Sequence, residues 1–338
     1  MSGSQLPVLI IGGSGVVGAQ AAATLRKLHP DLPIIIGGRD LARAQKTAHG
    51  LGNASAVVID LARRDLGLEA TPLGAIALFV KDHTLNSMRY ALDHKVPYVD
   101  LSSGTFEIGP GAALYIHHPD RAPILMASHW LAGAAVFPTL QLTAAYDTIA
   151  SIRVGVMLDE EDMGGPAAAA DYERLTTVAP AVLTIQGGET HYVTGDETKA
   201  TVRSVDGAHL TAQAYSPFDV LSLHAATSAQ AIRFDLVYGQ SASRRRGAPF
   251  STETIIDITG RRKDGTTSTS HLEIVHPQGQ APLTALGVAL GIEALMGLRG
   301  KAPTPGLYLP ETLIDPNYYV AQMKAFGTVF SAVTEGGH

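Results

Sequence analysis

The segment from Gly12 to Gly18, with the sequence GGSGVVG, carries the clearest chemical pattern in the chain. It contains a G-x-G-x-x-G spacing at Gly13, Gly15 and Gly18, between an apolar run rich in β-formers and an alanine-rich stretch typical of a helix. In this setting the glycines allow a tight turn, the approach of a pyrophosphate and close packing of the helix on the strand. We therefore predict a dinucleotide-binding loop, rather than a tight turn without a ligand, formed by Gly13, Ser14, Gly15, Val16, Val17 and Gly18.

The end of the second predicted strand, in the sequence IIIGGRD, indicates which dinucleotide binds. A site for NAD usually has an acidic residue there, which holds the ribose 2′-hydroxyl. This chain has Gly38 at that position and Arg39 after it, and an arginine can pair with a 2′-phosphate through two parallel hydrogen bonds. Ser14 can add a hydroxyl donor. We predict NADP (NADPH) in preference to NAD, with two alternatives: Asp40 serves the ribose, or Arg39 is a solvated loop residue.

Polar residues also follow later strands of the predicted sheet. In a doubly wound sheet the ligand lies beyond the carboxyl ends of the strands, so these residues are candidates for a reaction site. Hydride transfer to a double bond needs a proton donor as well, and histidine suits this role because its ordinary pKa is near neutrality. We predict His129 as the proton donor, with Asp82 and Lys81 as the next candidates and a structural histidine as the alternative. Asp60 and Ser102 are predicted to contact the cofactor.

Three further residues are predicted to bind the substrate. Trp130, the only tryptophan, offers a large contact area, although it can equally pack in the core. Arg245, in the sequence SRRRG, can clamp a carboxylate or be a solvated loop residue, and Tyr172 follows on a predicted helix. The acidic run Asp159–Asp162 lacks the spacing of a calcium loop, and no transition-metal pattern occurs, so we predict no metal site. A solvated acidic turn is the favoured interpretation of that run, and a site for a substrate ammonium is the other.

The elements that must position these residues change in type along the chain. In the first part strands alternate with helices, which indicates a parallel sheet with right-handed crossovers. In the middle, short strands with turn signals between them, including Asp264-Gly265, indicate antiparallel hairpins. A long apolar helix is predicted at 283–298 and a closing helix at 317–331. The fold class is therefore α/β: a Rossmann doubly wound parallel sheet with an inserted α+β domain built on an antiparallel sheet.

The chain resembles the saccharopine dehydrogenase-like (saccharopine reductase-like) oxidoreductases. The resemblance rests on GGSGVVG, IIIGGRDLARAQ, HKVPYVDLSS and GKAPTPGLYLPE, and covers roughly the first 130 and the last 50 residues. It implies three regions, which are a Rossmann domain at 1–133, an inserted substrate and dimerisation domain at 134–280, and a helical segment at 281–338 that packs back on the Rossmann domain.

The same resemblance implies a chemistry. It is hydride transfer between NAD(P)H and the C–N bond of an imine or secondary amine, with an amino-acid-like substrate bound in an interdomain cleft. The chain departs from the family pattern at KDHT (81–84) and ASHWLAGA (127–134), so the substrate cannot be carried over. Two rival functions stay open. One is an NADP-binding redox sensor without catalysis, and the other is a carbonyl reductase, although no tyrosine begins the Y-x-x-x-K of short-chain reductases.

Composition limits the other function classes. The 338 residues are 46% hydrophobic and 17% charged, which is typical of a globular protein large enough for two domains. A net charge of −6 without a long basic run argues against nucleic acid, and the lack of cysteine excludes disulfides and thiolate metal sites. No signal peptide or membrane span is predicted. We expect a cytoplasmic homodimer that acts on a small molecule.

Overall fold

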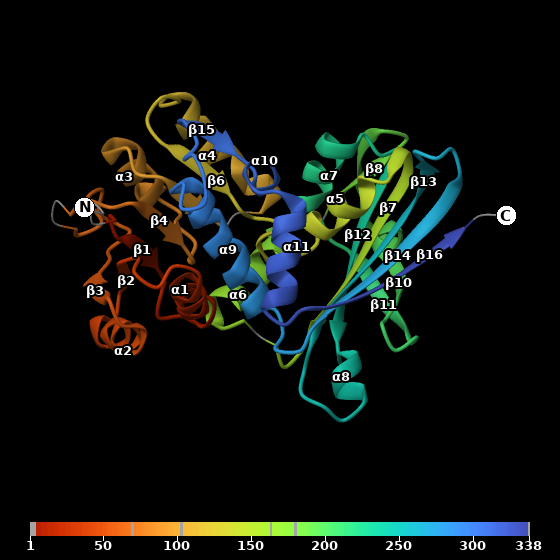
Figure 1. Cartoon of the computed structure of the whole chain (residues 1–338), viewed down its shortest axis with the longest axis horizontal. Coiled ribbons are helices and arrows are strands. Elements are labelled where there is room, and N and C mark those ends of the chain that lie inside the picture. Colours follow the sequence, from red (N-terminus) through yellow and green to blue (C-terminus); the bar gives the residue numbers. More distant parts are fainter. Residues whose placement is uncertain (1–4, 69–70, 102–103, 163, 179–180, 337–338) are drawn as a thin grey trace. The chain divides into compact units, whose positions relative to one another are not determined.

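The computed structural model describes residues 5–68, 71–101, 104–162, 164–178 and 181–336 (Figure 1). The chain divides into two compact units. The first contains the chain up to Ser128 together with Gly164–Asp171 and Thr284–Asp315, and the second contains His129–Met163, Tyr172–Leu283 and the chain from Pro316. The predicted dinucleotide-binding loop, Gly12 to Gly18, lies in the first unit.

The first unit is built on a seven-stranded parallel sheet in the order β15-β6-β5-β4-β1-β2-β3. Strand β1 is fully apolar and buried, as expected for a parallel sheet covered on both faces. The order β3-β2-β1-β4-β5-β6 is that of a doubly wound Rossmann sheet, which confirms the predicted fold class. The strands are β1 (Val8–Ile11), β2 (Ile34–Gly38), β3 (Ala54–Val58), β4 (Ala75–Leu78), β5 (Tyr98–Asp100), β6 (Pro123–Met126) and β15 (Gly306–Tyr308).

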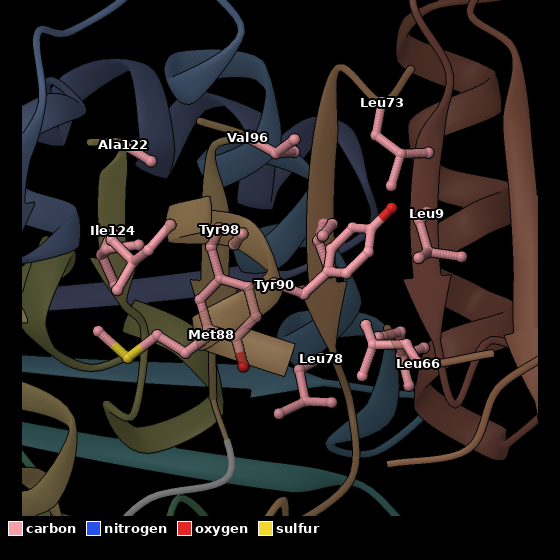
Figure 2. Close-up of a cluster of buried hydrophobic side chains, with 14 of the residues drawn as sticks. Leu9, Leu66, Leu73, Leu78, Met88, Tyr90, Val96, Tyr98, Ala122 and Ile124 are labelled. Atoms are coloured by element: carbon pink, nitrogen blue, oxygen red, sulfur yellow. The ribbon is translucent and has the colours of Figure 1, made fainter. Parts of the chain in front are cut away.

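Helices of this unit connect and cover the strands. Their bounds are α1 (Val16–Leu28), α2 (Leu41–Leu51), α3 (Asn86–His94), η1 (Thr105–Glu107), α4 (Ile108–Ile116), α9 (Ala281–Leu295, in this unit from Thr284) and α10 (Pro310–Leu313). Figure 2 shows the core on one face of the sheet, where Met88 of α3 lies beside Tyr98 and Ile124 of β5 and β6. The buried Tyr98 hydroxyl is 2.9 Å from Ser87 Oγ, which fixes α3 over the strand ends.

The segment 284–315 joins the first unit although it is remote in sequence. Gly291 of α9 crosses β6 so closely that a Cβ there would lie 2.6 Å from Leu125 Cδ2. Glu293 of the same helix is buried and pairs with His29 at 2.8 Å. Strand β15 then adds to the sheet edge in parallel with β6, a strand that we did not predict.

The second unit is built on a nine-stranded mixed sheet, in which β10-β11-β12-β7-β13-β14-β16 form the main path and β8 and β9 extend from β12. Its described pairs are antiparallel apart from β7 with β12. The Asp264-Gly265 hairpin is confirmed between β13 and β14. The strands are β7 (Tyr146–Asp159), β8 (Val182–Gln186), β9 (Glu189–Val193), β10 (Lys199–Arg203), β11 (His209–Ala214), β12 (Ala231–Gly239), β13 (Thr252–Arg262), β14 (Thr267–His276) and β16 (Val329–Gly336).

One predicted helix of the second unit ends early. The predicted closing helix stops at Ala325. Residues 329–336 instead form β16, which pairs with β14 and contains β-branched and aromatic residues typical of strands. The helical elements are η2 (Trp130–Gly133), α5 (Val136–Thr143), α6 (Pro166–Val178, shared between the units), η3 (Gly195–Thr198), α7 (Asp219–Thr227), α8 (Ala242–Arg245) and α11 (Pro316–Ala325). No helix of the described chain is long and apolar enough to cross a membrane.

Candidate functional site

The glycine loop between β1 and α1 has two positions that accept no side chain. A Cβ on Gly18 would fall on the carbonyl oxygen of Gly12 and lie 2.9 Å from Gly13 Cα. A Cβ on Gly13 would lie 2.8 Å from the carbonyl oxygen of Ile10. These contacts bring the first turn of α1 against the end of β1, as the third and first glycines of the motif require.

Gly15 is less crowded than Gly13 and Gly18. It is the N-cap of α1 with φ −78° and ψ 172°, and the one atom near an added Cβ is the Gly12 oxygen at 3.2 Å. No side chain caps this helix, and its first internal bond runs from Ala19 N to Gly15 O at 3.0 Å. The N–H groups of the first turn of α1 therefore lie at an uncapped helix start, where an anion can accept their hydrogen bonds. The geometry fits a pyrophosphate.

The end of β2 lies beside the same loop. A Cβ on Gly38 would be 3.6 Å from Ser14 Oγ, and the exposed Arg39 follows directly. Asp40 is the N-cap of α2, where its Oδ1 accepts the backbone N–H of Arg43 at 3.1 Å. Arg43 Nη2 in turn donates to the carbonyl oxygen of Ser14 at 3.4 Å. The structure thus brings Arg43 to Ser14 and leaves Arg39 exposed next to Gly38. We did not predict Arg43; the sequence signal that could have found it is its position three residues after the N-cap Asp40.

Asp60, another predicted cofactor contact, comes directly after Ile59, whose backbone N–H donates to the carbonyl oxygen of Gly38 at 3.0 Å. Asp60 follows β3 and is exposed, and its Oδ1 accepts the backbone N–H of Ala62 at 3.0 Å in a local turn. Ser102 lies outside the described residues.

A pocket of about 340 Å³ lies at the carboxyl ends of β5 and β6 and beside the loop after β4, within the first unit. Lys81 Nζ is 3.1 Å from Glu107 Oε2 in its wall, and both side chains are largely buried. Glu107 Oε2 also accepts the backbone N–H of Gly104 at 2.8 Å, which holds the carboxylate in place. We did not predict Glu107, because it belongs to a short 3₁₀ turn with no sequence motif.

Asp82, also in this wall, is fully engaged by its neighbours. Its two oxygens accept the backbone N–H and hydroxyl of Thr84 at 2.9 and 2.6 Å, and those of Ser87 at 2.8 and 2.6 Å. Burial raises the pKa of Asp82, but the hydrogen bonds from Ser87 and Thr84 outweigh burial and hold the pKa below its usual range. This carboxylate is ionised at neutral pH and stabilises the start of α3, which favours a structural role.

His129 lies in the second unit and is 5% exposed. Its Nε2 is 2.7 Å from Ser222 Oγ of α7, and the ring of Phe218 lies edge-on at 5.4 Å between centroids. Burial lowers the pKa of His129 to about 3. The imidazole is therefore neutral at pH 7, which disfavours it as an acid and favours a packing role.

The predicted substrate residues of the second unit also have partners within that unit. The Trp130 ring packs against Tyr215 and Phe234, with centroids 6.0 and 5.9 Å away, and its backbone N–H donates to Asp219 Oδ2 at 2.6 Å. Tyr172 stacks on Tyr238 with centroids 6.2 Å apart. These aromatic contacts favour core packing for Trp130.

The arginine cluster and the acidic run neutralise each other. Arg244 pairs with Asp159, Glu160 and Glu161 at 2.8, 3.2 and 2.9 Å. Asp159 and Asp162 are buried, so the run differs from the solvated acidic turn that we favoured. Arg245 donates to Asp206 at 2.8 Å and to Ser204 at 2.7 Å. Within the described chain no group of three or more histidines and acids is placed to hold a metal.

Asp162, the last residue of the acidic run, is separate from these ion pairs. It is buried beside Gly279, and its Oδ2 accepts the backbone N–H of Gln280 at 2.6 Å. Burial, reinforced by the nearby Asp159, raises the pKa of Asp162 to about 6 against the effect of the Gln280 hydrogen bonds.

No protein-family model and no curated protein sequence matches the chain. Among solved structures, apo saccharopine dehydrogenase (L-Glu forming) from Saccharomyces cerevisiae matches 98% of this chain and 100% of its own, with a TM-score of 0.70 and 12% identity. The chain has the fold of saccharopine dehydrogenase. Homospermidine synthase from Legionella pneumophila, solved in complex with NAD, matches 97% of this chain and 93% of its own, with a TM-score of 0.62 and 10% identity. The predicted resemblance is confirmed for the fold.

Proposed function

We propose that this chain is an NADP-dependent oxidoreductase that transfers a hydride to or from a C–N bond of an amino-acid-like substrate. The observation that carries the proposal is the glycine loop of Gly13, Gly15 and Gly18, which leads into an uncapped helix start in a Rossmann sheet. The shared fold with saccharopine dehydrogenase and with homospermidine synthase, which was solved with NAD, supports a dinucleotide and chemistry at a C–N bond.

The preference for NADP rests on the charges at the end of β2. The residue beside Ser14 at this strand end is Gly38, which carries no acidic side chain, and Asp40 commits one oxygen to the cap of α2. The Arg43 guanidinium lies at the glycine loop and the exposed Arg39 follows Gly38 directly, so that both can donate charge-assisted hydrogen bonds to a 2′-phosphate.

The reaction that we propose needs one proton for each hydride. When bound, the reduced nicotinamide supplies a hydride to the imine carbon, and a group of the chain protonates the imine nitrogen. Of the three predicted donors, Asp82 is an ionised cap and His129 is a neutral buried imidazole. Lys81 is the donor that we favour, because its ammonium faces a pocket at the strand ends where Rossmann folds bind their ligands.

The proposal is tested at Gly15. We expect Gly15→Val to abolish NADPH binding in a fluorescence titration with the circular dichroism spectrum of the fold retained, because a side chain there would occupy the place of the pyrophosphate while the backbone conformation of Gly15 is open to any residue. Gly50→Val is the matched control, since Gly50 lies in the same unit with no atom within 4 Å of an added Cβ. Tight NADPH binding by a folded Gly15→Val protein, or none by the unmodified chain, would show that the loop is only a turn.

A further inference from the structure

The backbone that leads to Lys81 is fixed against the glycine loop of the first unit. At the end of β4 the Phe79 N–H donates to the carbonyl oxygen of Ile11 at 2.9 Å. A Cβ on Gly12 would lie 3.1 Å from Val80 Cγ1, so the residues just before Lys81 pack on the start of the loop. Lys81 therefore leaves the sheet beside the loop that we propose to bind the dinucleotide.

Asp82, the residue after Lys81, is anchored to the start of α3. Its oxygens accept the backbone N–H and hydroxyl groups of Thr84 and Ser87. The Ser87 hydroxyl is in turn 2.9 Å from that of Tyr98, a member of the core that Figure 2 shows. With the chain held on both sides, the freedom left to Lys81 is that of its long side chain, and a lysine side chain has many rotamers. A partner is therefore needed to give the ammonium one direction.

Glu107 is a partner of Lys81 whose own position is fixed. Its Oε2 is 3.1 Å from Lys81 Nζ, and both side chains are largely buried. The Glu107 N–H donates to the Gly104 carbonyl oxygen at 2.8 Å, and Glu107 Oε2 accepts the Gly104 N–H at 2.8 Å, so the carboxylate is bonded back to its own turn. A partly buried ion pair is screened by salt much less than a surface pair. The contact therefore orients the ammonium at physiological ionic strength.

The other ionisable residues among the described lining of this pocket are Asp82, His83 and Asp100. Asp82 is committed to the start of α3, and His83 is exposed. Asp100 ends β5, the strand that pairs with β4, and is the alternative carboxylate for orienting Lys81. Glu107 differs from both because it belongs to the turn before α4, so its contact with Lys81 joins two separate elements of the pocket wall.

We propose that Glu107 is a positioning residue for Lys81, and that it holds the ammonium in the pocket for proton transfer to the imine nitrogen. The inference rests on the proposed function, in which Lys81 is the favoured donor. As the hydride adds to the imine carbon, Lys81 gives one N–H proton to the nitrogen and later regains a proton from water, while Glu107 stays ionised. A donor misplaced by about 1 Å can lower turnover by about 10²-fold, which is the reason for holding it.

The test replaces Glu107 by glutamine in the full chain and measures Lys81 directly as well as turnover. Glutamine keeps an oxygen that can accept the Gly104 N–H, so Glu107→Gln removes the charge and retains the turn. Lys81 is followed by acetic anhydride labelling and mass spectrometry, with the exposed Lys46 as internal reference. In Glu107→Gln we expect Lys81 to be labelled about tenfold faster relative to Lys46, because its amine is no longer held by a carboxylate. Turnover should fall by about 10- to 100-fold, with KM and NADPH affinity unchanged.

Asp93→Asn is the matched control, because it removes a carboxylate of the same unit whose ion pair with Arg64 is exposed, and it should change neither readout. Unchanged labelling of Lys81 in Glu107→Gln overturns the inference, and so does faster labelling with normal turnover. Faster labelling in Asp100→Asn alone assigns the role to Asp100 instead. An unmodified chain without turnover on any amine–ketone pair removes the proposed function, and the labelling then still decides whether Glu107 holds Lys81.

Discussion

Asp40 accepts the backbone N–H of Arg43 at 3.1 Å, and this hydrogen bond at the start of α2 bears on whether the site prefers NAD or NADP. From the sequence alone, Asp40 was an alternative ligand for the ribose of the cofactor. In the structure it caps a helix, and the same helix start brings the Arg43 guanidinium to the carbonyl oxygen of Ser14 in the glycine loop. Asp40 would favour NAD if it bound the ribose. In the structure it instead positions Arg43, which favours NADP.

The first prediction concerns the proton donor. With a substrate from an amine–ketone screen followed at the nicotinamide absorbance, Lys81→Met should lower turnover by about 10²- to 10⁴-fold and leave NADPH affinity nearly unchanged. His129→Asn should have a smaller effect on turnover, because the imidazole is neutral and buried against Ser222.

Lys46→Met is the control for Lys81→Met, since Lys46 is an exposed residue of α2 away from the pocket. Normal turnover in Lys81→Met together with a large loss in His129→Asn would reverse the two roles and restore His129 as the donor.

The second prediction concerns pH and stability. The pKa of Asp162 is about 6 in the folded chain and near 4 when unfolded, so between these values the folded state holds more protons than the unfolded state. The free energy of unfolding should therefore decrease as pH rises from about 4 to about 6, by at most roughly 3 kcal/mol from this residue. Asp162→Asn cannot ionise, and its amide oxygen can still accept the Gln280 N–H.

Urea unfolding at several pH values measures this contribution. The Asp162→Asn chain should lack the decrease that the unmodified chain shows, whereas Asp120→Asn, at an exposed aspartate, should keep it. Parallel pH curves for the unmodified chain and Asp162→Asn would mean that Asp162 titrates normally.

Local patterns predicted the first unit well, for a physical reason. The β1 strand is buried on both faces and therefore apolar, and the glycines of the loop are required by contacts between neighbours in sequence, such as Gly18 with Gly12. The alternation of strands and helices predicted the parallel, doubly wound sheet.

Features that depend on distant partners could not be predicted. Glu107 reaches Lys81 across 26 positions, and Arg244 meets Asp159 across 85, so neither pairing has a local signal. His129 had the right residue type, but its pKa is set by burial in the second unit, which its own segment does not reveal. Strand β16 similarly depends on its antiparallel pairing with β14, a strand that is remote in sequence.

The most direct measurement is the affinity of the full chain for NADPH and for NADH, determined by fluorescence titration with the Arg39→Ala and Arg43→Ala variants alongside. We predict tighter binding of NADPH, by about 10- to 100-fold for phosphate contacts worth roughly 1.5–3 kcal/mol, and a loss of that preference in each variant with NADH affinity unchanged. Equal affinities, or a preference for NADH that neither substitution alters, would contradict an NADP site at the end of β2.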